Sequence, residues 1–232
     1  MDLETFFTVI MVLMAFFVTF FGPVIIGLVI YKSIKDNKQR RIEKDINFVI
    51  QIKSHDPYFD PIAFKNSARD CIMEVYNCFY NLNFDRLRMI ESTDLYDIHK
   101  IDLETGLITG NLRTLEFSSF GDIIIDNYYI DGDKEVLCCS ATAFSKDIIF
   151  EPKTREYLID VPKYVFHQMK LEFARHVGVK TTPGKEFALK ECPNCGAEVA
   201  LNTFGQCSYC NSVVINGEHS WVLNKISDLY SN

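Results

Sequence analysis

The sequence lacks an N-x-Ser/Thr glycosylation sequon and any excess of basic residues. With 24 Lys and Arg against 31 Asp and Glu, the formal net charge is −7 at pH 7. Non-specific binding of nucleic acid requires a surplus of lysine and arginine, so no nucleic-acid partner is expected. The missing sequon favours a cytoplasmic location. A hydrophobic content of 48% excludes an intrinsically disordered composition, and a folded protein is expected.

Charge is also absent from the stretch between Thr5 and Tyr31, which is almost entirely apolar. About 20 apolar residues suffice to span a bilayer core. Residues 1–31 are therefore predicted to form a transmembrane anchor. A cleaved signal peptide is the alternative, but the residues before the stretch are acidic and no small-x-small cleavage site follows it.

A cluster of basic residues follows the apolar stretch. Its members are Lys32, Lys35, Lys38, Arg40, Arg41 and Lys44. Lysine and arginine are retained on the cytoplasmic side of a membrane. Residues 32–54 are thus predicted to form a basic juxtamembrane stalk in a single-pass protein of the cell membrane, with the N-terminus outside and the C-terminal domain in the cytoplasm. The bases either only set this orientation or also contact anionic lipid headgroups, and the lipid bilayer is an expected partner.

Residues 55–182 show helical patterns first and strand patterns afterwards. The prolines of SHDPYFDP (54–61) break the first helix, and Asp60-Pro61 then begins an amphipathic helix that runs to about Phe79. A second helical region covers 84–105 with a break near Glu91-Ser92. Strands are expected at 121–130, 135–144 and 163–180, the first two joined by a hairpin at Asp131-Gly132. This order predicts an α+β fold with helices packed on one face of an antiparallel sheet.

Four of the eight cysteines form two closely spaced pairs near the C-terminus, Cys192-x2-Cys195 and Cys207-x2-Cys210. Two such turns direct four thiolates at one ion, which is typical of a tetrahedral zinc site. A closed four-cysteine site leaves no position for water, so one structural Zn²⁺ per chain is predicted, held by a ribbon within 183–232. Two disulfides are the alternative, but they require an oxidising compartment. A terminal helix over 217–230 is expected, because Val222, Ile226 and Leu229 would share one helical face.

Several of these segments resemble the bacterial Tim-forty-four-like domain proteins, named after the C-terminal domain of a mitochondrial protein-import translocase subunit. The matching segments are DPYF (56–59), LYDIHK (95–100), GVKT (178–181) and the ending CPNCG…CSYCN…GEHSWVLNKI (192–226). The resemblance implies a nuclear-transport-factor-two-like cone, in which long helices cover a curved antiparallel sheet around a pocket. It also implies a link to protein transport or membrane-associated assembly.

Two functions are compatible with these patterns. The first is a membrane-anchored cytoplasmic binding or scaffold module without catalytic activity, which acts on an unknown protein partner. The second is an enzyme or small-ligand binder that uses the pocket of the cone, for isomerase-like or dehydratase-like chemistry. Its candidate acid–base residues are Asp94, Asp97, His99 and His167. A pocket lined only by apolar groups would argue against the enzyme, and a deeply buried acid hydrogen-bonded to a histidine would favour it.

Overall fold

The structure is a computed structural model that describes residues 3–159, 163–181, 192, 194–197, 207–210 and 220–228. The chain divides into two compact units, Met1–Glu43 and Lys44–Asn232. Its elements, in chain order, are α1 (Leu3–His55), α2 (Pro61–Asn81), α3 (Phe84–Ile90), α4 (Thr93–Thr109), β1 (Leu112–Phe120), β2 (Ile124–Asp131), β3 (Lys134–Phe150), β4 (Lys163–His176) and β5 (Val222–Asp228).

The first unit consists of the N-terminal part of α1, and it corrects one prediction. Within the described part of the chain, no helix combines the length and the apolar character that crossing a membrane requires. The predicted transmembrane anchor at 1–31 is therefore wrong, and so is the predicted single-pass location with the N-terminus outside.

The basic cluster lies on the continuation of the same helix. Residues 32–54 are helical throughout. The six side chains, Lys32, Lys35, Lys38, Arg40, Arg41 and Lys44, are all exposed. Their contact with anionic lipid headgroups stays a prediction.

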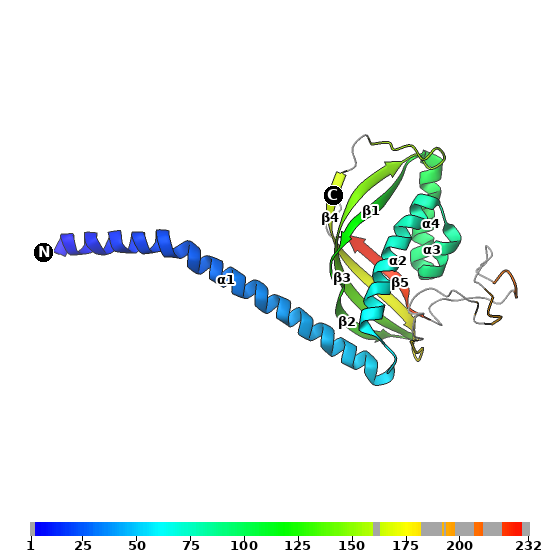
Figure 1. Cartoon of the computed structure of the whole chain (residues 1–232), viewed down its shortest axis with the longest axis horizontal. Coiled ribbons are helices and arrows are strands. Elements are labelled where there is room, and N and C mark those ends of the chain that lie inside the picture. Colours follow the sequence, from blue (N-terminus) through cyan, green and yellow to red (C-terminus); the bar gives the residue numbers. More distant parts are fainter. Residues whose placement is uncertain are drawn as a thin grey trace. The chain divides into compact units, whose positions relative to one another are not determined.

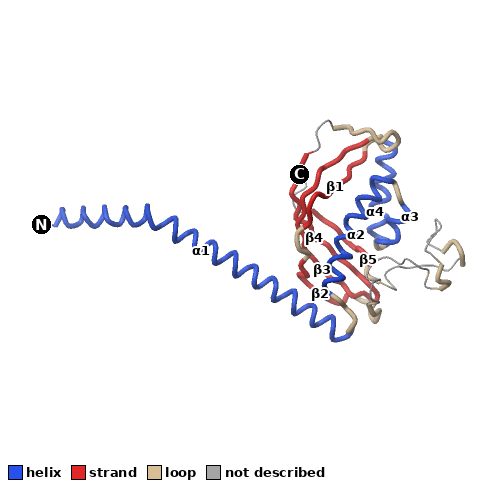
Figure 2. The backbone as a smooth tube through the Cα atoms, viewed as in Figure 1, coloured by secondary structure: helices blue, strands red, loops and turns tan. Residues whose placement is uncertain are grey.

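The second unit is an α+β fold, as predicted. The strands form one antiparallel sheet of order β1-β3-β4-β5, and β2 pairs with the other part of the long strand β3. Helices α2, α3 and α4 gather on one side of this sheet, as Figure 1 shows, and Figure 2 shows the strands curving along their length. The hairpin at Asp131-Gly132 is confirmed, because Asp131 pairs with Lys134 and Gly132 has a φ of 59°.

The helix boundaries follow from local chemistry that the sequence displays. Helix α2 begins at Pro61, and the Asp60 side chain accepts hydrogen bonds from the backbone amides of Ile62 (2.8 Å) and Ala63 (3.1 Å). These bonds satisfy amides that have no partner within the helix. The predicted break near Glu91-Ser92 separates α3 from α4, and the Ser92 hydroxyl caps α4 by accepting from the Leu95 amide.

The buried face of the sheet is apolar in its centre and polar at two ends. On β4 the alternate residues His167, Met169, Leu171, Phe173 and Arg175 are all buried. On β3 the buried alternate positions run from Glu135, which pairs with Arg175, to Ser145, which lies near His167. Side chains two residues apart on a strand share a face. One end of the buried face therefore carries an arginine with a glutamate, and the other carries a histidine with a serine.

The C-terminal segment differs from the prediction. Residues Val222–Asp228 form strand β5, which pairs antiparallel with β4, and the terminal helix expected over 217–230 is wrong. The segment completes the sheet because β4 offers it an unpaired edge. From Lys225 onward, exposed residues alternate with partly buried ones: Lys225 and Ser227 are exposed, and Ile226 and Asp228 are partly buried, a pattern that fits a strand on the edge of a sheet. Most of the predicted ribbon at 183–232 lies outside the described residues, namely 183–191, 193, 198–206, 211–219 and 229–232.

Candidate metal centre and buried polar sites

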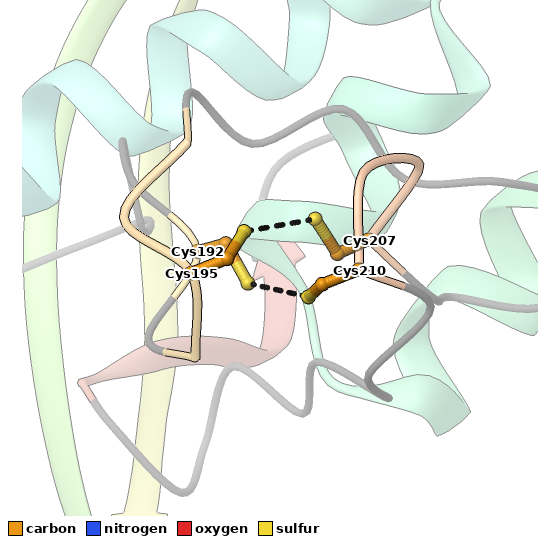
Figure 3. Close-up of side chains that lie close together, drawn as sticks. All are labelled: Cys192, Cys195, Cys207 and Cys210. Atoms are coloured by element: carbon orange, nitrogen blue, oxygen red, sulfur yellow. Dashed lines mark hydrogen bonds between the residues drawn. The ribbon is translucent and has the colours of Figure 1, made fainter.

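The four paired cysteines converge on one point, as predicted. The sulfur atoms of Cys192, Cys195, Cys207 and Cys210 all lie within 4.8 Å of one another. The Sγ atoms of Cys192 and Cys210 are 3.6 Å apart, and those of Cys195 and Cys207 are 3.8 Å apart. Figure 3 shows the four side chains facing one another from two turns. Each turn contributes one thiol to each close pair, so the cluster joins the two turns.

The first turn is shaped by its backbone hydrogen bonds. The Gly196 amide donates to the Cys192 carbonyl (2.8 Å), and the Cys192 amide donates to the Ala197 carbonyl (2.7 Å). Gly196 has a φ of 70°, a conformation that favours glycine. The Asn194 side chain donates to the Cys210 sulfur at 3.5 Å, and this bond suits a sulfur that carries negative charge. The turn thus presents two sulfurs together with a hydrogen-bond donor.

The cysteine cluster contacts helix α3. The side chains of Cys192 and Cys207 are buried, and they pack with Met89 and with Cys210. Met89 is the sixth residue of α3, so the helix supplies the apolar wall of the cluster. A set of four thiols at this spacing, partly shielded from water, fits a soft or borderline metal ion. These four residues could hold a metal ion, and thiolate is the donor that they would supply.

A second site surrounds the buried guanidinium of Arg175. Arg175 is 1% exposed, and its Nε atom donates to Glu135 at 2.8 Å while its Nη1 atom donates to Asp56 at 2.8 Å. Thr181 donates to the same Asp56 oxygen through its hydroxyl (2.6 Å) and its amide (3.1 Å). Burial raises the pKa of Asp56, but the bonds from Thr181 and Arg175 outweigh it and hold that pKa below the usual value.

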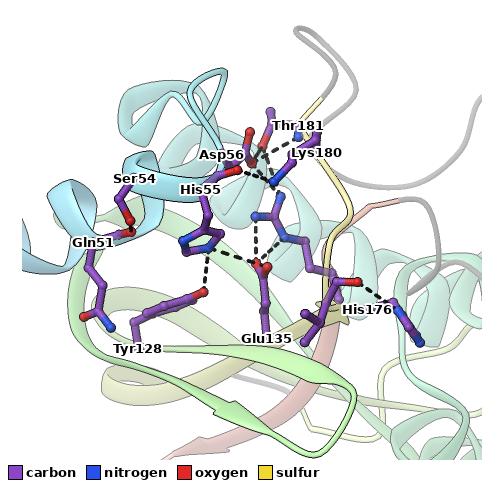
Figure 4. Close-up of polar contacts among 11 residues, drawn as sticks. Gln51, Ser54, His55, Asp56, Tyr128, Glu135, His176, Lys180 and Thr181 are labelled. Carbon is purple, nitrogen blue, oxygen red and sulfur yellow. Dashed lines mark hydrogen bonds and ion pairs between the residues drawn. The ribbon is translucent and has the colours of Figure 1, made fainter.

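The Arg175 site reaches the surface through His55, the last residue of α1. The His55 Nε2 atom lies 2.8 Å from the Tyr128 hydroxyl and 3.5 Å from Glu135, and the ring stacks on Tyr128. Lys180 donates to the His55 carbonyl, an acceptor that the end of a helix leaves open. Burial is the main cause that raises the pKa of Tyr128 to about 12. Figure 4 shows these contacts between the end of α1, the sheet and the segment at 180–181.

A third site lies at the opposite end of the buried face. The Nδ1 atom of His167 contacts the Asp228 carboxylate, and its Nε2 atom lies 2.7 Å from the Ser145 hydroxyl. A carboxylate only accepts, so the Nδ1 atom donates to Asp228 and the Nε2 atom accepts from Ser145. This order matches the acid–histidine–serine relay of hydrolases. Ser145 and His167 are both 0% exposed, so a substrate carbonyl has no path to Ser145 in this conformation, and the burial favours a structural role.

A second acid–histidine pair joins α3 to α4. The Nδ1 atom of His99 lies 2.6 Å from the Glu91 Oε1 atom, and the His99 ring packs edge-on against Phe79. The Glu91 side chain is fully buried, and its Oε2 atom has no hydrogen-bond partner among the described residues. Burial raises the pKa of Glu91, and the bond from His99 opposes that rise only in part.

The four predicted acid–base candidates separate into two groups. His99 and His167 each pair with a carboxylate, whereas Asp94 and Asp97 are exposed on α4. The carboxylate partners of the two histidines were not anticipated, and neither was the pairing of Arg175. The alternation of β4 could have revealed part of this, because it places His167 and Arg175 on the same face as Leu171.

No protein-family model matches the chain, and no curated protein matches it.

Proposed function

We propose that the chain is a non-enzymatic binding or scaffold module, stabilised by one structural zinc ion, that presents helix α4 to a basic and apolar segment of a partner protein. The observation that carries the proposal is a line of exposed isoleucines on α4. Ile98 is 58% exposed, Ile101 is 62% exposed and Ile108 is 85% exposed. Residues three and ten positions apart lie on one side of a helix, so these side chains form a single stripe.

Acidic side chains border this isoleucine stripe. The exposed carboxylates of α4 belong to Asp94, Asp97, Asp102 and Glu104. Lys100 is the one lysine of α4, which has no arginine, and it pairs with Glu104 at 3.8 Å. An apolar stripe flanked by carboxylates complements a helix or strand that carries apolar residues beside lysine or arginine. The acidic charge of the whole chain, −7, supports the same kind of partner.

The rigid attachment of α4 supports a binding role. On its inner side, Leu103 is fully buried and Leu95 and Gly106 are also buried. A carbon added at Gly106 would lie 2.3 Å from Leu112, so the helix sits close against β1. A helix that is fixed in this way loses little conformational entropy when a partner binds to its outer side. The resemblance to Tim-forty-four-like domains supports a scaffold that holds a protein partner.

The donor set supports zinc as the metal. Four cysteine thiolates are the donors most typical of structural zinc, and the two Cys-x2-Cys turns have the spacing of zinc ribbons. Zinc in such a site supplies no reaction centre, because all four positions are filled by protein ligands. Its role would be to hold the segment around 192–210 together beside α3.

The binding proposal is tested with a photo-activated crosslinking residue at Ile101 in the full chain, expressed in its own cells. The control is the same residue at Ile130, which is 59% exposed on β2. We expect a discrete adduct at position 101 only, and the crosslinked segment should be rich in lysine or arginine. The double variant Asp97→Lys, Asp102→Lys should reduce the adduct at least about fivefold. An acidic crosslinked segment, or an adduct that charge reversal leaves unchanged, would contradict the proposal.

A small-ligand binder or enzyme is the second candidate, favoured by the two buried acid–histidine pairs. The relay of Ser145, His167 and Asp228 would require a conformation in which Ser145 becomes accessible. Turnover of a p-nitrophenyl ester that disappears in the Ser145→Ala variant would establish this activity. Turnover that is equal in Ser145→Ala and in the unaltered protein would exclude Ser145 as a nucleophile.

A further inference from the structure

The buried guanidinium of Arg175 contacts both flanks of the cysteine-bearing segment. Its Nη1 atom donates to the Thr181 hydroxyl at 3.2 Å, and Thr181 is the last described residue before Cys192. The guanidinium carbon lies 4.3 Å from the centroid of the Trp221 ring, which follows the segment. Arg175 and Trp221 are each 1% exposed. Thr181, which follows β4, and Trp221, which precedes β5, therefore lie beside the same side chain.

The same guanidinium also binds the residue that follows α1. Asp56 accepts from Arg175, and the Asp56 amide donates to the Ile52 carbonyl at 2.8 Å, which continues the hydrogen bonding of the helix. Ile52 and Asp56 are both 0% exposed. Thr181 donates twice to Asp56. Figure 4 shows Asp56 and Thr181 side by side above Glu135. One buried cluster thus joins the end of α1 to both ends of the cysteine segment.

We propose that metal binding at the four cysteines strengthens the docking of the C-terminal end of α1, residues 45–55, through the contacts of Arg175. The proposal rests on the metal site proposed above. Metal binding joins the turn that carries Cys192 and Cys195 to the turn that carries Cys207 and Cys210, and a cross-link of this kind lowers the entropic cost of bringing Thr181 and Trp221 together. A restrained segment holds its two ends in place at a lower entropic cost. By linkage, docking of α1 strengthens metal binding by the same factor.

The charges around Arg175 make this cluster sensitive to small displacements. Glu135 and Asp56 are the acidic groups that face the guanidinium, and Lys180 and His55 lie at the rim. Buried ion pairs are favourable only while their geometry is good, because both charges have lost their hydration. A shift of Thr181 would remove two of the hydrogen bonds to Asp56. A displacement of Thr181 on loss of the metal is thereby transmitted to the last turn of α1.

The experiment compares the zinc-loaded full chain with the chain after removal of metal by a chelator. Metal content is measured on both samples. The readouts are amide hydrogen exchange in residues 45–55 and the fluorescence of Trp221, the single tryptophan of the chain. We expect exchange in 45–55 to rise about tenfold when zinc is removed, and the Trp221 emission to move to longer wavelength. Both changes should reverse when zinc is restored.

Three threonine variants test whether the coupling between the metal site and α1 passes through Thr181 and Arg175. Thr181→Val removes the hydroxyl and should retain one zinc per chain while the effect of zinc on exchange in 45–55 falls below about threefold. Thr181→Ser keeps the hydroxyl and should retain the full effect. Thr114→Val is the matched control, because Thr114 is also buried and donates to the Tyr76 carbonyl at 2.7 Å, away from Arg175. It should also retain the full effect.

The measurements distinguish failure of the metal-site proposal from failure of the coupling proposal. A chain that never binds zinc in the metal measurement overturns the metal site and the coupling with it. A chain that binds zinc but exchanges at the same rate in 45–55 with and without it overturns the coupling alone. A Thr181→Val variant that keeps the tenfold effect overturns Arg175 and Thr181 as the route.

Discussion

The Nε2 atom of His167 lies 2.7 Å from the Ser145 hydroxyl, and both side chains are fully buried on the sheet. Asp228 contacts the other nitrogen of the ring and belongs to β5, the last strand. Nearby Tyr76 has its pKa raised to about 12, mainly by burial and also by the charge of Asp228. The three side chains therefore connect β3, β4 and β5 within one hydrogen-bonded chain. Their position favours a structural role, in which the three side chains hold the C-terminal strand in register. We call this set of Ser145, His167 and Asp228 the polar staple.

Removal of the Ser145 hydroxyl should weaken this staple. Ser145→Ala leaves the Nε2 atom of His167 buried without a donor, which costs about 1–3 kcal/mol in the free energy of unfolding. Urea denaturation measures the loss. Ser118→Ala is the matched control, since Ser118 donates to the Phe144 carbonyl from an exposed position and should change stability by less than about 0.5 kcal/mol. Equal stability of the two variants would show that the staple contributes nothing.

The sequence predicts the local features of this fold better than its long-range pairings. Asp60-Pro61 predicts the start of α2, and Asp131-Gly132 predicts the hairpin. Both features depend on only a few neighbouring residues. The spacing of Val222 and Ile226 predicts a helix, but these residues lie on strand β5. What decides between the two is the open edge of β4, which lies far away in the sequence.

The same distinction applies to the sites. The cysteine cluster is predictable from the sequence. Each Cys-x2-Cys pair places two thiols in one short turn, and two such pairs supply the four ligands of one metal site. The Arg175 site joins Asp56 to Thr181, which are more than a hundred positions apart in the sequence. No local sequence pattern predicts such a pairing. The burial of Glu91 beside His99 likewise depends on how α3 and α4 pack.

Glu91 is expected to make the stability of the protein fall as pH rises. Its pKa is raised in the folded state, so the folded protein holds this proton more tightly than the unfolded chain. The free energy of unfolding should therefore decrease as pH rises from about 4.3, the pKa of an unperturbed glutamate, through the folded pKa. Glu91→Gln removes this contribution and should be more stable, relative to the unaltered protein, at neutral than at acidic pH.

Urea unfolding at a series of pH values measures the contribution of Glu91. Glu104→Gln is the control, because Glu104 is exposed on α4 and pairs only with Lys100 at 3.8 Å. Its pH profile should match that of the unaltered protein. A Glu91→Gln profile that matches it as well would contradict the prediction.

Asp56 should have the opposite dependence on pH. Its pKa is lowered in the folded state, so the stabilisation is fully present above about pH 4, the pKa of an unperturbed aspartate, and is lost as pH falls through the folded pKa. At neutral pH, Asp56→Asn should cost roughly 3 kcal/mol, because it removes one buried partner of Arg175. Asp60→Asn is the matched control, since asparagine caps a helix as well as aspartate does. A similar loss in both variants would refute a special role for Asp56.

The metal prediction separates the paired cysteines from Cys71 and Cys78 of helix α2. The four paired sulfurs lie within 4.8 Å of one another, and these are the thiols that could share one metal ion. Cys71 and Cys78 instead pack in the hydrophobic core of the fold. The purified chain should contain about one zinc, Cys207→Ala should contain almost none, and Cys78→Ala should keep its zinc. Elemental analysis of the three proteins checks this.

Loss of the metal should increase amide hydrogen exchange first in helix α3. Met89 packs directly against Cys192 and Cys207. A Cys207→Ala chain therefore loses both the metal and part of the packing against Met89. Amide exchange in Phe84–Ile90 should rise in that variant by more than it rises in Cys78→Ala, where only a cavity is created in the core. If instead the two variants show the same exchange in α3 while only one of them has lost zinc, the metal has no structural role at this helix.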